Sequence, residues 1–463
     1  MKFRQITKFL LLFVLAALTI SSCSDDEETT TTIGSSSDAQ IYSFKLAAKP
    51  NNALDSTTYP QIAKTKFSID QFKLLIYNAD SLPYRTAMRK FYATLAFSTS
   101  GTSSIHLVYP DTIMEWNTTD SVDFSIATPK FLVTAADGLS KKEYTLDLRV
   151  HQVDPDTLIW APQALSLPST VKQQKTVLKG TSFYTFSIDE DNAFYIRKAT
   201  TTSAAYDNKQ MVSGLNANNV ELGSMTLFKD NFYALDKAHN VYNSTDGINW
   251  TLKQSNVLTI LGVVPGLASD GDEDKLLVIT ENNEFATFAD YSSSMQIVRA
   301  LTSTELDGNS VQKGVPFSVF SSSVNFDRKN QNLNMLAVTA GKTKSGVNSN
   351  DTWMFRVSDT NVLQVSVASK NSIFAANEGI VTFVYDGYFY ALTKKIFYKS
   401  GFSFKWAEAP SKEQFVDPLV PNASGQSIIV DDKNYIWIFG GVTGSGSVPS
   451  TIWKGRLNKL YTK

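Results

Sequence analysis

The stretch that decides the fold is Asp386–Leu392, which reads DGYFYAL: a tight-turn dipeptide that leads directly into an aromatic strand. Nearly the same sequence stands at Asp230–Leu235. Looser copies with the same order of turn residues and apolar residues occur at Asp191–Tyr195, Asp274–Val278, Gln331–Leu336 and Asp432–Trp437. A repeated β unit of this kind buries both faces of its sheet only against its neighbours. We therefore expect an all-β fold class, with a six-bladed β-propeller over residues 157–463.

The two ends of the repeat region predict that the array closes into a ring. The last copy supplies only three strands and ends at Ile452–Leu457. Leu158–Pro162 has the Trp and Pro that also mark Trp406–Pro410, the expected fourth strand of the preceding copy. We expect residues 157–162 to complete the last blade, because this pairing removes two sheet edges that would otherwise template aggregation.

A separate β-sandwich is expected over residues 41–153. Apolar and polar residues alternate with period two, which buries one face of each strand, at Ile41–Leu46, Phe91–Phe97, Lys130–Ala135 and Tyr144–Val150. Asp137-Gly138 stands between the last two strands and favours a tight hairpin. The pattern favours an antiparallel sandwich, which resembles the Ig-like modules of bacterial surface proteins. Phe67–Tyr84 has no clear pattern and stays unassigned.

The first 40 residues predict export and a lipid anchor. Residues 1–22 have the parts of a signal peptide: a basic start, a twelve-residue apolar run (Phe9–Ile20) and small residues. The run is shorter than the ~20 residues that a membrane-spanning helix needs. Cys23 follows at once and resembles the lipidated cysteine of a bacterial lipobox. Residues 23–40 contain this cysteine and a flexible spacer, which is first acidic and then rich in Thr and Ser. The acidic cluster resembles the surface-export signal of Bacteroidota lipoproteins.

Two copies resemble named repeat types. Tyr242–Trp250 is similar to an Asp-box hairpin, and Ile438–Gly441 followed by Trp453 is similar to a kelch motif. Together, the lipobox, acidic spacer, Ig-like domain and kelch-like propeller resemble a family of uncharacterised Bacteroidota surface lipoproteins. That resemblance implies placement at the outer membrane, facing the cell exterior, and implies no activity.

Composition excludes some classes of partner. The whole chain has 43 basic and 44 acidic residues, and without Lys2, Arg4 and Lys8 the balance is 40 against 44. No basic stripe is available to follow a phosphate backbone, so we expect no nucleic-acid partner. Cys23 is the only cysteine, so the chain has no intrachain disulfide to stabilise it.

The sequence offers no recognisable catalytic constellation, so we predict no catalytic residues and no cofactor. Copper-oxidase chemistry is excluded for the propeller because His239 is its sole histidine and it has no cysteine. The arginines of the propeller have none of the sequence context that a sialidase-like site requires. Hydrolysis by two carboxylates stays open, since any pair of acids could meet in the central channel.

One acidic stretch has the carboxylate spacing of a calcium loop. Asp270, Asp272 and Asp274 alternate, and Glu281 stands at the twelfth place. Lys275 occupies the sixth place, where that loop needs Gly, and an apolar strand follows instead of a helix. We expect a solvated hairpin and no metal, with these three aspartates as weak candidates.

The function that we predict is a lipid-anchored, non-catalytic binding protein at the cell surface, which engages a glycan or an outer-membrane protein partner through a propeller face. The alternatives are a polysaccharide-processing glycosidase or lyase and a structural subunit of an outer-membrane assembly. The sequence identifies no binding residues, so the ligand and the binding face stay open.

Overall fold

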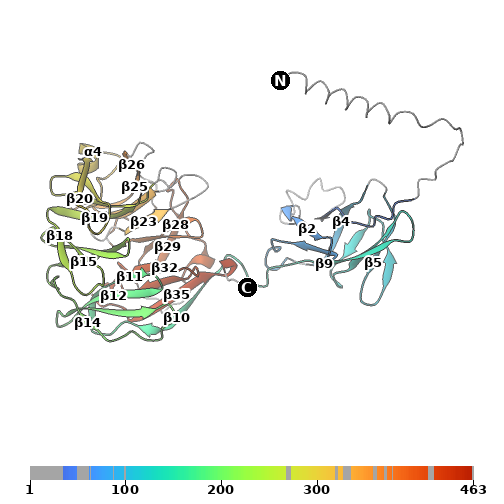
Figure 1. Ribbon diagram of the computed structural model, residues 1–463, viewed down its shortest axis with the longest axis horizontal. Helices are drawn as coiled ribbons and strands as arrows, with labels where there is room; N and C mark the ends of the chain where they lie inside the picture. Colours follow the sequence, from blue (N-terminus) through green and yellow to red (C-terminus); the bar gives the residue numbers. More distant parts are fainter. Residues whose placement is uncertain are drawn as a thin grey trace, which may run out of the picture. The chain divides into compact units, whose positions relative to one another are not determined.

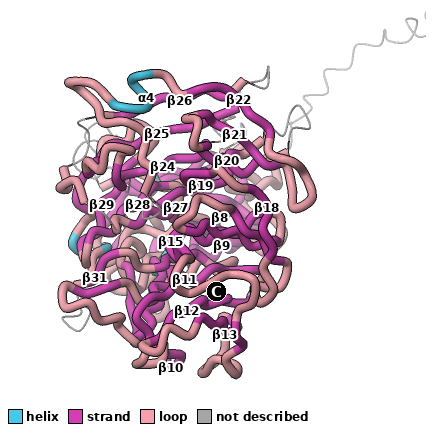
Figure 2. The backbone as a smooth tube through the Cα atoms, turned by 90° about the vertical axis from the view of Figure 1, so that its left-hand side faces the viewer, coloured by secondary structure: helices cyan, strands magenta, loops and turns pink. Residues whose placement is uncertain are grey.

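The chain forms two compact units, Met1–Gln152 and Val153–Lys463 (Figure 1). The computed structural model describes residues 35–48, 62, 64–86, 88–98, 101–266, 273–318, 322–326, 335–357, 362–369, 373–377, 379–415 and 422–460. Strands make up nearly all of the regular structure in these residues (Figure 2). No helix in the described parts of the chain is long and apolar enough to cross a membrane.

The first unit is a sandwich of two sheets. The smaller sheet has the order β1 (Ser43–Ala47), β4 (Lys90–Ala96), β7 (Ser121–Asp123). The larger has the order β2 (Phe67–Asp70), β3 (Leu75–Asn78), β9 (Lys141–Asp147), β8 (Lys130–Ala135), β5 (Thr102–Val108), β6 (Ile113–Glu115). Inward residues of both sheets share one core, in which the rings of Phe44 and Phe131 lie 5.6 Å apart. This shared core follows from the period-two alternation of the strands.

The hairpin expected at Asp137-Gly138 is present. The Asp137 carboxylate accepts hydrogen bonds from the backbone N–H groups of Leu139 and Ser140, and Gly138 adopts φ +71°. The antiparallel expectation fails at one pair, because β3 and β9 run parallel. Parallel pairing is possible there because a long connection, not a tight turn, joins the two strands.

The described residues of the second unit form six four-stranded antiparallel sheets. The first three are β11 (Val171–Lys179), β12 (Ser182–Asp189), β13 (Phe194–Thr200), β14 (Gln210–Met211); β15 (Val220–Phe228), β16 (Asn231–Asp236), β17 (Val241–Ser244), β18 (Thr251–Gln254); and β19 (Val257–Val264), β20 (Lys275–Thr280), β21 (Glu284–Phe288), β22 (Gln296–Ala300). The fourth and fifth are β23 (Ser322–Phe326), β24 (Met335–Lys342), β25 (Asn348–Val357), β26 (Leu363–Ala368); and β27 (Val381–Tyr385), β28 (Tyr388–Thr393), β29 (Ile396–Ser400), β30 (Ala407–Glu408). The sixth has the order β32 (Ser427–Val430), β33 (Ile436–Phe439), β35 (Thr451–Leu457), β10 (Leu158–Ser166).

Shorter elements among the described residues of this unit lie between these strands or after the last of them. They are the helix α4 (Ser303–Asp307), the 3-10 turns η1 (Ser411–Glu413) and η2 (Asn458–Leu460), and a two-stranded pair of β31 (Ala423–Ser424) with β34 (Val442–Thr443).

The first strands of the six sheets form a closed ring. Each of β11, β15, β19, β23 and β27 contacts the first strand of the following sheet, and β32 contacts β11. Gln174 on β11 donates from Nε2 to the carbonyl oxygen of Phe439, at 3.0 Å, across the point of closure. Gly440 makes this approach possible, because a Cβ there would lie 2.6 Å from the Gln174 side chain.

The last sheet takes its fourth strand from the start of the unit. β10 pairs antiparallel with β35, with Leu158 opposite Leu457 and Pro162 opposite Trp453. This is the pairing that the Trp and Pro of Leu158–Pro162 predict.

The first copy of the repeat is out of phase with the others, which corrects the sequence assignment. Asp386-Gly387 and Asp230 lie in turns between the first and second strands of their sheets, whereas Asp191–Tyr195 joins β12 to β13, the second and third. The equivalent first turn in that sheet contains Gly180, with φ +61°. Both turns of a sheet favour residues that tolerate positive φ, so turn residues alone do not distinguish them.

The Asp-box hairpin forms as the sequence predicts. Asp246 Oδ1 accepts hydrogen bonds from Ser244 Oγ and from the backbone N–H groups of Ile248 and Asn249. Trp250 is buried, and its ring lies 5.9 Å from that of Phe186 on the preceding sheet. The motif therefore fixes a turn and fills the space between two sheets.

Candidate functional site

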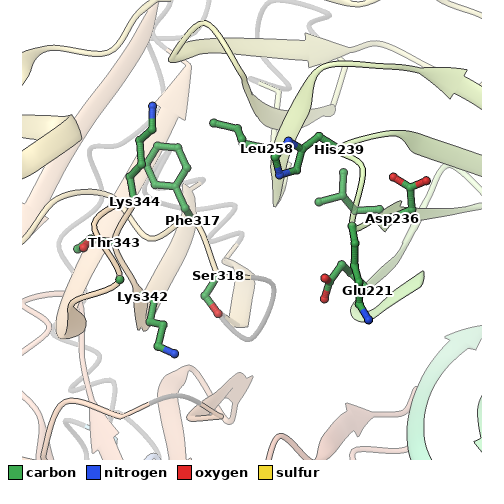
Figure 3. A pocket seen from close by; sticks show the side chains of 12 residues that line it. Glu221, Asp236, His239, Leu258, Phe317, Ser318, Lys342, Thr343 and Lys344 are labelled. Carbon is green, nitrogen blue, oxygen red and sulfur yellow. The ribbon is translucent and has the colours of Figure 1, made fainter. Parts of the chain in front are cut away.

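A polar groove of about 390 Å³ opens between the ends of three sheets of the second unit. We call it the groove. One wall comes from β15, β16 and the turn after β16, and the opposite wall comes from the hairpin that joins β24 to β25 and from the segment before β23 (Figure 3). Its lining is Glu221, Leu235, Asp236, Lys237, His239, Leu258, Phe317, Ser318, Lys342, Thr343, Lys344 and Gly346.

Glu221 is the acidic side chain of the groove that has no fixed partner. It stands second on β15, opposite Leu235 of β16, and is half-buried. Its carboxylate makes no hydrogen bond or ion pair to any residue that the structure describes. Burial raises the pKa of Glu221, and the positive charges of Lys237 and His239 oppose this shift. Partial burial weakens the hydration of a carboxylate, so hydrogen-bond donors from a ligand would bind it favourably.

Three neighbouring acids already have structural contacts. Asp236 Oδ1 accepts hydrogen bonds from the backbone N–H groups of Ala238 and Asn240, at 3.0 and 2.8 Å, and so holds the turn after β16. Asp189 has the same role in the neighbouring sheet. Glu281 lies 2.6 Å from Nδ1 of His239.

The opposite wall is cationic and apolar. Lys344 extends from the hairpin after β24 beside the ring of Phe317, and Lys342, the last residue of β24, lies on the same wall nearer to Ser318 (Figure 3). Lys344 Nζ donates to Asn283 Oδ1 at 2.5 Å, which ties the hairpin to the adjacent sheet. The groove thus places a hydrogen-bond acceptor, ammonium groups and an aromatic ring around one space.

The residues singled out from sequence do not meet in this groove. Cys23, Asp270 and Asp272 lie outside the described residues. Asp274 accepts a hydrogen bond from the Gly266 N–H at 3.0 Å, and the neighbouring Glu273 forms an ion pair with Lys229. Within the described residues, no group of three or more His, Cys, Asp or Glu side chains is placed to hold a metal ion.

Sequence reasoning missed the groove because its residues come from five separate segments. Glu221 stands in a strand that has no motif, and Phe317 lies about a hundred positions later. Only the hairpin around Gly341–Gly346 gave a local signal, since it reads as an insertion in the repeat.

Comparison with solved structures finds distant likenesses. YjhT is 9% identical, with a TM-score of 0.45, covering 63% of this chain and 96% of that one. A protein of unknown function from Bacteroides thetaiotaomicron VPI-5482 is 11% identical, with a TM-score of 0.37, covering 89% and 99%. The lectin of Aleuria aurantia, described as a six-bladed β-propeller with a novel fucose recognition mode, is 11% identical, with a TM-score of 0.35, covering 63% and 98%. No ligand follows from likenesses this distant.

No curated protein matches the chain. Two family models match it: the DUF6242 N-terminal domain, of unknown function, over residues 29–148, and the DUF6242 beta propeller domain over residues 154–463. The second match covers more than half of the chain and coincides with the ring of six sheets. The chain therefore belongs to the DUF6242 family, with its N-terminal domain followed by its β-propeller domain.

Proposed function

We propose that this protein is a non-catalytic binding protein whose groove engages a glycan. The observation that carries the proposal is Glu221: a half-buried carboxylate that lines a polar groove and has no partner among the described residues. Burying such a group without compensation destabilises the fold, and a ligand with hydroxyl donors would supply the missing hydrogen bonds.

The chemistry of the two walls favours a sugar. A pyranose has hydroxyl donors and acceptors around its edge and apolar C–H faces. Glu221 accepts from hydroxyls, Lys342 and Lys344 are cationic donors, and Phe317 provides a flat apolar surface. Binding sites commonly combine apolar contact with a few fixed polar groups in this way.

The groove does not favour hydrolysis. Glycoside hydrolysis ordinarily requires two carboxyl groups, one protonated and one ionised, on either side of the scissile bond. Asp236 is the other carboxylate of the lining, and its Oδ1 atom already holds two backbone N–H groups. Withdrawing that carboxylate from the turn would disorder the wall of the groove.

We propose the cellular setting from the N-terminal sequence. Cys23 would carry a lipid anchor at the outer membrane, facing the cell exterior, and the spacer and an Ig-like sandwich would carry a six-bladed, kelch-like propeller. Support comes from the lipobox pattern, the sandwich of two sheets and the closed ring of six sheets. Intact mass spectrometry of the protein purified from membranes tests the anchor. A chain that begins at Cys23 with attached acyl groups is expected, and an unmodified cysteine would refute it.

The binding proposal is tested by thermal shift of the chain from Ser24 to Lys463 against a panel of host and plant glycans. A ligand at ~100 times its Kd should add ~2.7 kcal/mol of stability. Glu221→Gln should abolish the shift, whereas Glu408→Gln, an exposed acid on the outer strand β30, should keep it. A shift that survives Glu221→Gln would place the glycan elsewhere, and no shift across the panel would favour a protein partner.

A further inference from the structure

Two turns of the first unit present a fully exposed apolar side chain on the same kind of scaffold. Asp70 Oδ1 accepts hydrogen bonds from the N–H groups of Phe72 and Lys73, both at 3.0 Å. Asp137 Oδ1 accepts from the N–H groups of Leu139 and Ser140, at 2.8 and 2.9 Å. Phe72 is 102% exposed and Leu139 is 84% exposed. Each aspartate thus fixes the backbone at the residue that stands out into solvent.

The two turns lie at one end of the sandwich. The Phe72 turn precedes β3 and the Leu139 turn precedes β9, and these strands are neighbours that run parallel. Leu75 pairs with Thr145, so the Leu139 turn lies further from this pair along the strand axis than the Phe72 turn. A flat surface that touches both turns would therefore be tilted relative to β3 and β9.

The chain also enters the sandwich at this end. The N–H of Asp137 donates to the carbonyl oxygen of Ser36 at 3.1 Å, and Gln71 Nε2 donates to the carbonyl oxygen of Ile41 at 2.6 Å. Tyr42 follows and is 57% exposed, with its hydroxyl bonded to Asp38. We call Tyr42, Phe72 and Leu139 the apolar end.

The length of chain before Ser35 limits what can lie opposite the apolar end. Only eleven residues, 24–34, separate Cys23 from the first described residue. Fully extended, they span at most ~40 Å. If Cys23 is lipidated, as proposed above, the apolar end is the part of the sandwich nearest to the point of attachment along the chain.

We propose that the apolar end rests on the lipid surface, with Phe72 and Leu139 inserted at the level of the head groups. An exposed aromatic or leucine side chain gains free energy on leaving water, and Tyr commonly lies at the membrane interface. The side chain of Lys73 is 77% exposed beside Phe72 and its Nζ lies 3.8 Å from the Asp70 carboxylate, an exposed ion pair that Lys73 would exchange for lipid phosphates. The contact orients the sandwich on the membrane, which a tether at one point alone does not do.

The first test uses the lipidated protein in vesicles of equimolar phosphatidylethanolamine and phosphatidylglycerol that contain nitroxide-labelled lipid. Acylation blocks Cys23, so Phe72→Cys or Leu139→Cys supplies a single thiol for a fluorophore. Ile113→Cys is the matched control: Ile113 is 63% exposed and pairs with Val108, at the opposite end of the same sheet. The nitroxide lipid should quench probes at 72 and 139 and spare the probe at 113. Equal quenching at all three positions, or none at 72 and 139, would overturn the proposal.

The second test does not depend on the anchor. The chain from Ser24 to Lys463 should sediment with the same vesicles, and Phe72→Ser with Leu139→Ser should weaken partitioning about tenfold. Ile113→Ser should leave partitioning unchanged. Weak partitioning that is insensitive to the double substitution would contradict the lipid contact even if Cys23 is acylated. If Cys23 is unmodified but the double substitution still weakens partitioning, the anchor is refuted and the lipid contact is kept.

Discussion

Ser427 Oγ accepts a hydrogen bond from the backbone N–H of Thr176 at 2.9 Å, although 251 positions separate the two residues. Ser427 opens the first strand of the last sheet, and Thr176 lies in the middle of the first strand of the first sheet. Both residues are buried, so the ring is closed by a polar contact that water does not reach.

Removing this hydroxyl should loosen the closure. Ser427→Ala leaves a buried N–H donor without its acceptor, which costs about 1–3 kcal/mol of unfolding free energy. Urea unfolding monitored by tryptophan fluorescence measures the loss. Ser445→Ala, in an exposed hairpin, is the control and should change stability by no more than about 0.5 kcal/mol. An equal effect of the two substitutions would mean that the contact does not stabilise the ring.

The Asp-box hairpin should weaken in acid. Burial opposes ionisation of Asp246, but hydrogen bonds from Asn249, Ile248 and Ser244 outweigh it and lower the pKa of Asp246 to about 2. Because the pKa is lower in the folded state, Asp246 adds stability at pH values above 3.8, the ordinary pKa of the group. This stability is lost as the pH falls from 3.8 towards about 2. Asp246→Ala should therefore lower the urea midpoint at pH 7, and the difference from wild type should shrink across this range. A constant difference at every pH would contradict this account.

Glu221 should have the opposite pH dependence. Its pKa is raised by burial, so the folded state is favoured below the ordinary value of 4.5 and is penalised as the pH rises through the raised value. Glu221→Gln should raise the melting temperature at pH 7. The gain in unfolding free energy should be at most about 1 kcal/mol, because the side chain is half-exposed. Below about pH 4.5 the two proteins should melt together. A destabilised Glu221→Gln protein at pH 7 would show that the carboxylate has a structural partner.

Calcium should leave the melting temperature unchanged. Glu281 contacts His239, and Asp274 accepts from the Gly266 N–H, so two acids of the calcium-like spacing already have partners. Calcium binding requires several oxygen ligands at once. A calcium-dependent shift in scanning calorimetry that Asp272→Ala abolishes would reverse this prediction.

Sequence reasoning succeeded where the chemistry is local. Asp137-Gly138, Asp386-Gly387 and the Asp-box residues specify turns through positive φ or side-chain hydrogen bonds, and the structure has turns at each. The missing fourth strand of the last copy predicted the pairing of β10 with β35 because a strand without a partner is unfavourable.

The rest depends on information that no short segment contains. The β2–β3 turn has no Gly, Pro or Asn that would mark it in the sequence: Leu74 adopts φ +51°, and the Asp70 carboxylate holds the backbone. The groove was missed because Glu221 becomes significant only when Phe317 and Lys344 lie opposite it. Such pairings are set by the order of the sheets around the ring.

The pairing of β10 with β35 has a consequence for synthesis. Leu158 leaves the ribosome about 300 residues before its partner Leu457, so the first strand of the second unit to be made is the last one of that unit to pair. Until then the growing chain is an open arc with two unpaired edges, and a chain cut short before Thr451 stays in that state. We expect premature termination that removes β35 to yield aggregates and not a shorter, working ring.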